Sequence, residues 1–468
     1  MIVCRGGLGP VRVGARGRGL DLHARRAGAL GSLWRHQEAV QEYERALALY
    51  DALGEHLRFV ETCAPLAIFL SRTGQLQEAR KIVDRAARHA KDAPPSIRCV
   101  LLALEANTGA SVGEIDRALE LFDELHKSSE NELPPRVIGL VTEQDMYTRY
   151  DAGQLDLCEA AARKASRIFE QAGDVWSLAD VAIGRFSPPL QSGRPAEAEE
   201  LIDQAIRHAT RVGHDVAKFC ALAALPLMYL AKGDLESAER AAREALAFGA
   251  SCHFGWLFMA ETSLGGILLY RSQTEEALSL LTKAASGPTT HFSGFPQGLL
   301  ALGMSVAERD GAANACSAAM RFLPRPGTSR GTGAWHAVLA LTEAFWLSGR
   351  REEAGRLQLE AEKIAVEWDC NMVGFPVLTA AGIAAACTGN WTSAEKHHRA
   401  SIARMEAVPY VTAQPIARYW YADMLVERGV AGDIEAAKAL LQESMAASDA
   451  IGLALYARLA RQRLTRIA

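Results

Sequence analysis

The sequence is short of the features that mark several protein classes. Its net charge is only −4, from 51 Lys plus Arg against 55 Asp plus Glu, so we expect no nucleic-acid partner and no attraction to an acidic membrane surface. With 17 prolines and 7% aromatic residues, it is neither collagen nor a mucin-like stalk. The longest uncharged apolar run, Phe219 to Ala231, contains Pro226 and is too short to cross the ~30 Å of a hydrocarbon core.

Cysteine pairs and catalytic motifs are also missing. The nine cysteines are widely spaced and form no CxxC pair, which favours reduced, buried thiols in the cytoplasm over disulfides or a zinc site. The sequence contains no Gly-x4-Gly-Lys-Ser/Thr phosphate loop, no GxSxG and no HExxH. We therefore expect no catalytic residues, no metal and no cofactor.

The first 30 residues differ in composition from the rest. They hold six arginines and seven glycines, and Asp21 is their only acid. A transit peptide would also be rich in serine and amphipathic, but this stretch has no serine and too much glycine to favour a helix. We predict a flexible Arg/Gly-rich leader over 1–30 and a repeat array over 31–468.

The dominant signal is an internal repeat. A small residue, usually glycine, is followed at +5 by Ala or Cys and in most copies at +12 by another small residue. The first members of the copies are at positions 34, 74, 113, 153, 193, 233, 272, 311, 349, 389 and 432, so successive steps run from 38 to 43 residues. Chance would not keep ten intervals so close to 40.

This spacing predicts pairs of helices. The glycine suits a tight joint between two helices, and small residues at +5 and +12 share one face of the second helix, where they permit close packing. At +9 most copies carry a larger apolar residue, and exceptions include Gln358 and His398. We predict an all-α fold, a right-handed α-α superhelix of about eleven helical hairpins with a period near 40 residues.

The pattern of Gly, Ala at +5, a bulky residue at +9 and a small residue at +12 resembles the tetratricopeptide repeat, although that repeat has 34 residues. The longer period and the segment from Tyr421 to Leu441 are similar to the C-terminal repeat regions of bacterial signalling ATPases, maltose-activator-like regulators and class III adenylate cyclases. The resemblance implies a protein–protein interaction scaffold or sensor. Alternatively, it implies a detached regulatory half of such an ATPase, cyclase or transcription activator.

In tetratricopeptide-like arrays the first helix of each hairpin lines a concave groove. Residues six and ten before the joint are one helical turn apart and would face inward. The partner-binding candidates chosen by this rule are Glu143, Tyr147, Leu227, Thr262, Leu339 and Glu343, and the rule also selects Ala223, Gly266, Thr379 and Ile383. Such a groove would suit an apolar or weakly basic helix or peptide.

Two further interpretations can be stated from the residues. An enzyme built on a helical toroid would use Glu143 and Glu343, but only the chain length and the inner groove favour it. The densest histidine cluster is His397 and His398 with Glu395. Adjacent helical residues point about 100° apart and make a poor metal pair, so we expect a solvated face there.

Overall fold

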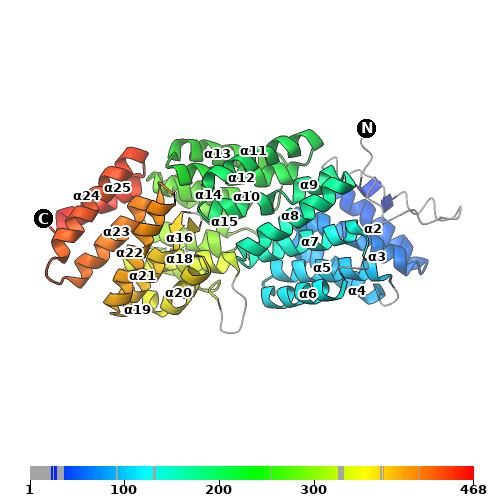
Figure 1. Ribbon diagram of the computed structural model, residues 1–468, viewed down its shortest axis with the longest axis horizontal. Coiled ribbons are helices and arrows are strands. Elements are labelled where there is room, and N and C mark those ends of the chain that lie inside the picture. Colours follow the sequence, from blue (N-terminus) through cyan, green and yellow to red (C-terminus); the bar gives the residue numbers. More distant parts are fainter. Residues whose placement is uncertain are drawn as a thin grey trace.

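The structure, a computed structural model, describes residues 23–24, 26–28, 36–90, 93–129, 133–252, 254–324, 331–368, 371–372, 374–408 and 410–468. The expected leader over 1–30 lies outside the described residues except for five positions. The prediction of an all-α solenoid is confirmed, and Figure 1 shows hairpin following hairpin from the N-terminal to the C-terminal end. The number of hairpins and the handedness of the superhelix stay predictions.

The helices form two layers. The first helices of the hairpins make the inner layer: α3 His56–Arg72, α5 Pro95–Ser111, α7 Pro135–Asp151, α9 Val175–Asp180 with α10 Ile183–Gln191, α12 Asp215–Lys232, α14 Leu257–Tyr270, α16 Gly294–Val306, α18 Thr332–Leu347, α21 Val377–Cys387, α23 Ala413–Arg428 and α25 Ala454–Arg466. The second helices make the outer layer: α2 His36–Ala52, α4 Leu76–His89, α6 Ile115–Ser129, α8 Leu155–Ala172, α11 Pro195–Val212, α13 Leu235–Ser251, α15 Thr274–Ala285, α17 Ala312–Met320, α19 Arg351–Arg356 with α20 Gln358–Glu367, α22 Trp391–Ala407 and α24 Asp433–Ile451.

The repeat positions explain how the layers pack. Every residue at +5, from Ala39 to Ala437, is buried, because it faces the inner helix of its own hairpin at close range. Outer helices are otherwise amphipathic, whereas inner helices such as α18 and α21 are buried on nearly every side. Helices buried all round need apolar residues on every face, which is why the inner segments lack a clear polar stripe.

The joints have the predicted backbone. Gly74 has φ of +81°, a left-handed conformation that costs a residue with a Cβ about 1–2 kcal/mol. The same conformation recurs at Gly113, Gly153, Gly193, Gly233, Gly349, Gly389 and Gly432. One joint was predicted wrongly: Gly311 has φ of −84°, and the left-handed residue of that hairpin is Glu308. The connection there is longer, and α17 begins only at Ala312.

A small sheet interrupts the helical pattern. Strands β1 (Asn371–Met372) and β2 (Phe375–Pro376) pair antiparallel just before α21. The sequence did not predict them. The hydroxyl of Tyr270 on α14 donates a hydrogen bond to the carbonyl of Gly374 at 3.1 Å, so this hairpin is held against an inner helix far away in the sequence.

Successive turns of the superhelix touch along a line that we call the inter-turn seam. Most contacts join the end of one inner helix to the start of another, or to the loop before it, about 180 residues later. They are Ser71, Thr73 and Gly74 with Gly255 and Trp256; Ser111 with His291; Gly153 with Trp335; and Leu230, Ala231 and Gly233 with Val411 and Thr412. His291 also contacts Asp151, which ends the next inner helix. The partners of three of these contacts are 185, 180 and 182 residues apart; divided by a period of 40, these separations give about 4.5 hairpins per turn.

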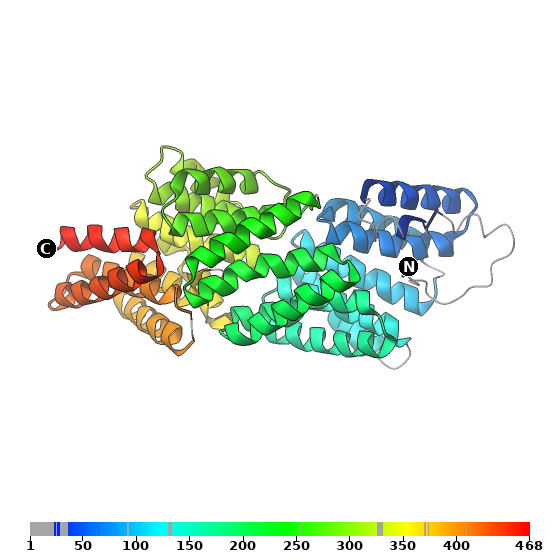
Figure 2. The same cartoon turned by 90° about the horizontal axis from the view of Figure 1, so that it is seen from above.

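The seam is made largely by backbone groups. Gly255 N–H donates to Thr73 O at 3.1 Å, His291 N–H to Ser111 O at 3.1 Å, and Val411 N–H to Ala231 O at 2.7 Å. In Figure 2, seen from above, the green helices run obliquely between the N-terminal and C-terminal groups of helices. Because the turns contact each other directly, side chains on the inner helices are enclosed by the chain itself.

Candidate functional site

Four charged or titratable side chains from four inner segments meet within the first turn. Arg72 ends α3, Glu143 lies in the middle of α7, Asp180 ends α9, and His214 caps α12. One Arg72 Nη2 lies 2.5 Å from Glu143 Oε1 and 2.7 Å from Asp180 Oδ2, and His214 Nε2 lies 3.0 Å from Asp180 Oδ1. We call Arg72, Glu143, Asp180 and His214 the axial cluster.

Polar atoms around the axial cluster are only partly satisfied. Tyr147 donates a hydrogen bond from its hydroxyl to the backbone carbonyl of Asp180 at 3.1 Å, and the Trp176 ring stacks on His214 with centroids 4.2 Å apart. Among the described residues, however, Glu143 Oε2 and Arg72 Nε are buried and have no hydrogen-bond partner. Thr142 Oγ1, Thr148 Oγ1 and Ser71 Oγ share that condition. Buried polar atoms without partners cost about 1–3 kcal/mol each, so each of these atoms would gain from a hydrogen-bonding partner.

The two carboxyl groups of the axial cluster share one guanidinium, and their pKa values shift in opposite directions. Burial raises the pKa of Glu143 to about 7, against the attraction of Arg72. Burial also acts on Asp180, but Arg72 and His214 outweigh it and lower the pKa of that carboxyl. Asp180 therefore stays ionised at neutral pH, while Glu143 is poised to gain or lose a proton.

A second acid is enclosed in the next turn. Glu343 on α18 accepts a hydrogen bond at Oε2 from the hydroxyl of Tyr456 at 3.2 Å, and Tyr270 and Tyr419 lie against Tyr456 with ring centroids 6.1 and 5.5 Å away. No Lys, Arg or His among the described residues forms an ion pair with Glu343. Burial raises its pKa to about 8, so this carboxyl is mostly protonated at neutral pH.

The six predicted partner-binding residues are distributed as follows. Glu143, Thr262, Leu339 and Glu343 are buried, whereas Tyr147 and Leu227 are half-buried. Of the other positions selected by the rule, Ala223 and Gly266 are half-buried, and Thr379 and Ile383 are buried. All of these residues lie on inner helices, but in this conformation the buried ones offer a partner no surface. Their role as partner contacts stays a prediction.

Arg72, Asp180, His214 and Tyr456 were missed. Each follows or begins an apolar inner segment near a joint, where a charged or polar residue is unremarkable on its own. Arg72 is 71 residues from Glu143 in the sequence, and Tyr456 is 113 residues from Glu343. These distances reflect the winding of the superhelix, which the repeat period alone does not give. A known number of hairpins per turn would have paired them.

The histidine cluster differs from expectation. His398 is fully buried, stacks on Tyr421 and has no hydrogen-bond partner for either ring nitrogen among the described residues; burial lowers its pKa to about 3. The expectation of a solvated face was therefore wrong for His398. The reason is its place at +9 of its repeat, the slot filled by a bulky core residue in most other copies.

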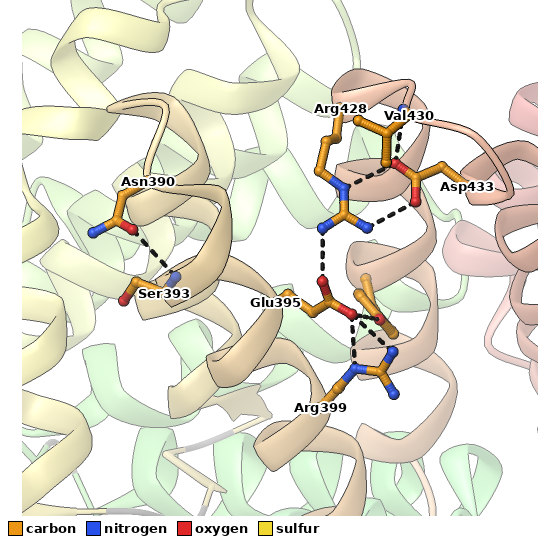
Figure 3. A network of polar contacts seen from close by, with 8 residues as sticks. Asn390, Ser393, Glu395, Arg399, Arg428, Val430 and Asp433 are labelled. Carbon is orange, nitrogen blue, oxygen red and sulfur yellow. Dashed lines mark hydrogen bonds and ion pairs between the residues drawn. The ribbon is translucent and has the colours of Figure 1, made fainter.

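Glu395, the acid predicted beside these histidines, pairs with arginines instead. It accepts hydrogen bonds from Arg399 at 2.7 Å and from Arg428 at 2.6 Å, and Arg428 also binds Asp433 through two nitrogens (Figure 3). Hydrogen bonds from Arg428 and Arg399 lower the pKa of Glu395 to about 2. The network ties α22 to α23 and α24, so it joins neighbouring hairpins.

Two searches over the described residues were negative. No group of three or more His, Cys, Asp or Glu side chains in that part of the chain is arranged to hold a metal ion. Among the helices that the structure describes, none combines the length and the apolar character needed to span a bilayer.

Comparison with known proteins finds similarity in structure but not in sequence. No protein-family model matches the sequence, and no curated protein sequence matches it. A Rap protein solved with competence and sporulation factor is 12% identical, with a TM-score of 0.47 over 87% of this chain and 97% of that one. Yeast Tom70 is 14% identical, with a TM-score of 0.36 over 96% of both chains.

A signal transduction ATPase with a tetratricopeptide repeat sensor, PH0952 from Pyrococcus horikoshii, is 13% identical, with a TM-score of 0.39 over 81% of this chain and 55% of that one. The chain is a tetratricopeptide-like solenoid. The regular joints, the buried small residues at +5 and the two helical layers of the structure itself support this description.

Proposed function

We propose that this solenoid is a non-catalytic scaffold or sensor that binds a protein or peptide partner at its axis-facing inner helices. The observation that carries the proposal is the set of buried, unpartnered polar atoms in and beside the axial cluster, chiefly Glu143 Oε2 and Arg72 Nε. Because Glu143 is enclosed in this conformation, the first turn would open locally before main-chain and side-chain groups of a bound peptide supplied the missing donors and acceptors. Hydrogen bonds to these polar atoms would contribute to the affinity for a polar segment of the partner.

The chemistry of the cluster favours a partner with a basic group. Glu143 and Asp180 share one guanidinium, so a lysine, an arginine or an amino terminus would complete the charge balance. Half-buried Tyr147, whose hydroxyl donates to the Asp180 carbonyl, offers aromatic surface beside it, and half-buried Leu227 offers apolar surface farther along α12. Thr262, Leu339 and Glu343 belong to the same proposed surface, and partner contact at these buried residues requires the two turns to separate.

The same proposal places the protein in the cytoplasm. Cys63, Cys158, Cys220, Cys252, Cys316 and Cys387 are free thiols, and burial raises the pKa of Cys63 to about 12. Unpaired thiols are typical of a reducing compartment.

The experiment places a photo-crosslinking amino acid, p-benzoyl-phenylalanine, at Tyr147 or at Leu227 in the full chain in cells. The matched control carries it at Leu157, which is exposed on the outer helix α8. We expect one protein partner to be captured from positions 147 and 227 but not from 157. The purified partner should then bind the chain in calorimetry, and Glu143→Gln should weaken that binding because the basic group loses its ionised acceptor.

Capture only from position 157, or equal affinity of the wild type and Glu143→Gln for the partner, would contradict an axial site. Turnover of a small-molecule substrate by the purified chain, lost in Glu143→Gln and Glu343→Gln, would replace the scaffold by an enzyme.

A further inference from the structure

The C-terminal end of α3 holds the second turn of the superhelix. The Ser71 carbonyl accepts a hydrogen bond from Trp256 Nε1 at 3.3 Å, and the Thr73 carbonyl accepts one from the N–H of Gly255 at 3.1 Å. Both acceptors are main-chain groups, so the two bonds depend on where the backbone at this end of α3 lies. A shift of that backbone by about 1 Å lengthens both beyond hydrogen-bond distance.

Arg72 lies between these two residues and binds the first turn instead. Its Nη2 lies 2.5 Å from Glu143 Oε1 and 2.7 Å from Asp180 Oδ2, and its side chain is 20% exposed, against 0% for Glu143 and 2% for Asp180. The guanidinium therefore covers both carboxyl groups, and solvent reaches it before it reaches them. One short segment thus holds the axial cluster and the inter-turn seam at once.

An accessible stripe on α3 leads to the guanidinium. Pro65, Ile68 and Arg72 are three and four residues apart, so they share one face of the helix; Pro65 is exposed and Ile68 is half-buried. Half-buried Tyr147 lies beside the acids, because its hydroxyl donates to the carbonyl of Asp180. A group that approaches along this stripe meets Arg72 before either acid.

Pro65 is also the point at which α3 bends most easily. Proline has no N–H, so it cannot donate the helical hydrogen bond to the carbonyl of the residue four positions earlier, and helices kink where that bond is missing. The part of α3 after Pro65 carries Ser71 and Arg72 and leads to Thr73. A tilt about Pro65 therefore moves the seam acceptors and the guanidinium together.

We propose that Arg72 is an internal substitute for the basic group of the partner and that displacement of Arg72 releases the seam at α3. The first part rests on the function proposed above, in which a lysine, an arginine or an amino terminus binds Glu143 and Asp180. Such a cation restores the charge balance of the two acids, but it is not attached to α3, so this helix end loses the ion pairs that hold it in place. The bonds that Ser71 and Thr73 accept then weaken. Binding at the axis and closure of the seam therefore oppose each other, by about 5- to 150-fold in affinity.

The test separates the charge of Arg72 from its attachment to α3. Arg72→Ala is compared with the wild type by native-state hydrogen exchange of the full chain, with and without ethylguanidinium, a soluble copy of the missing head group. The amides of α7 report on the axial cluster, and the Gly255 N–H reports on the seam. We expect Arg72→Ala to speed exchange at both, by about tenfold or more at Gly255, and ethylguanidinium to restore protection in α7 but not at Gly255. The control is Arg243→Ala, which breaks an exposed pair on α13 and should change both rates by less than about twofold, with or without the additive.

A second pair of variants covers the case in which Arg72→Ala does not fold. Arg72→Gln keeps most of the side-chain length without the charge, whereas Arg72→Lys keeps a charge attached to α3. We expect exchange at Gly255 to be about tenfold faster or more in Arg72→Gln and to stay within about threefold of the wild type in Arg72→Lys.

Recovery of protection at Gly255 together with α7 would overturn the proposal, because the charge alone would then suffice. Equal protection at Gly255 in Arg72→Gln and Arg72→Lys would do the same. These experiments use no partner, so they are independent of the crosslinking at Tyr147. A purified partner should bind Trp256→Phe, which lacks the seam donor, about fivefold more tightly or better than the wild type. A partner whose binding depends on Glu143 but not on Trp256 would support the proposed function and refute the release of the seam.

Discussion

Gly74 and Gly255 touch across the inter-turn seam so closely that a Cβ on Gly74 would lie 2.8 Å from the carbonyl carbon of Gly255. The neighbouring Thr73 carbonyl accepts the Gly255 N–H. Glycine at position 74 therefore serves two purposes, because it forms the joint of its own hairpin and allows another turn to approach.

We expect Gly74→Ala to destabilise the chain more than Gly349→Ala does. Both glycines are joints with positive φ, +81° and +74°, so both substitutions carry similar backbone strain of about 1–2 kcal/mol. A Cβ on Gly349 would meet nothing within 4 Å, whereas a Cβ on Gly74 would meet backbone atoms, which adds about 1–3 kcal/mol. A larger fall in melting temperature for Gly74→Ala, with faster hydrogen exchange at Gly255 in that variant alone, would support the prediction. Equal losses of stability in the two variants would argue against an inter-turn seam in solution.

Removing Arg72 should loosen the first turn. Arg72→Ala leaves the buried Glu143 carboxyl without its cation and Asp180 with His214 alone, and breaking a buried pair in this way costs about 3–5 kcal/mol. Arg243→Ala, which breaks an exposed pair with Glu276, should cost about 1 kcal/mol or less. Native-state hydrogen exchange in α3 and α7 measures the effect. Similar protection in the two variants would mean that the axial cluster contributes little to stability.

Glu343 should make the chain less stable as the pH rises. Its pKa is about 8 in the folded chain and about 4.3 in an unfolded one, so between these values the folded state holds more protons and the free energy of unfolding falls with increasing pH. Glu343→Gln cannot titrate and should be more stable than the wild type at pH 9, by on the order of a few kcal/mol. Melting curves from pH 5 to pH 9 test this, with Glu435→Gln as the exposed control. Parallel curves for all three proteins would contradict it.

His398 should have the opposite effect on the acid side. Its pKa is about 3 in the folded chain and about 6.5 in an unfolded one, so the wild type loses stability as the pH falls below about 6.5. His398→Leu fits the apolar slot at +9 and should be close to neutral at pH 7 but more stable at pH 4, by on the order of 3 kcal/mol. His208→Leu, at a partly exposed position, is the control. A constant difference between the variant and the wild type from pH 7 to pH 4 would contradict the prediction.

The sequence predicted what depends on contacts within one hairpin. The residues at +5 and +12, such as Ala79 and Ala86, are local to two helices, so their spacing gives the fold class and most joints. The prediction of a joint at Gly311 was wrong because its hairpin has a longer connection, which the spacing of small residues does not reveal. Contacts such as Arg72 with Glu143 depend on how many hairpins complete a turn. Small rotations between neighbours determine that number, and no single position encodes it.

The register of the inter-turn seam constrains how the gene for this chain can change. In an open repeat array, duplication of one 40-residue unit lengthens the molecule and leaves every other contact in place. Here, an extra unit between Ala231 and Gly255 would separate the partners of the three backbone hydrogen bonds of the seam, Thr73 with Gly255, Ser111 with His291 and Ala231 with Val411, so these bonds would be lost together. Substitutions away from the seam and the buried clusters leave this register intact, whereas the number of units between seam partners is fixed by geometry.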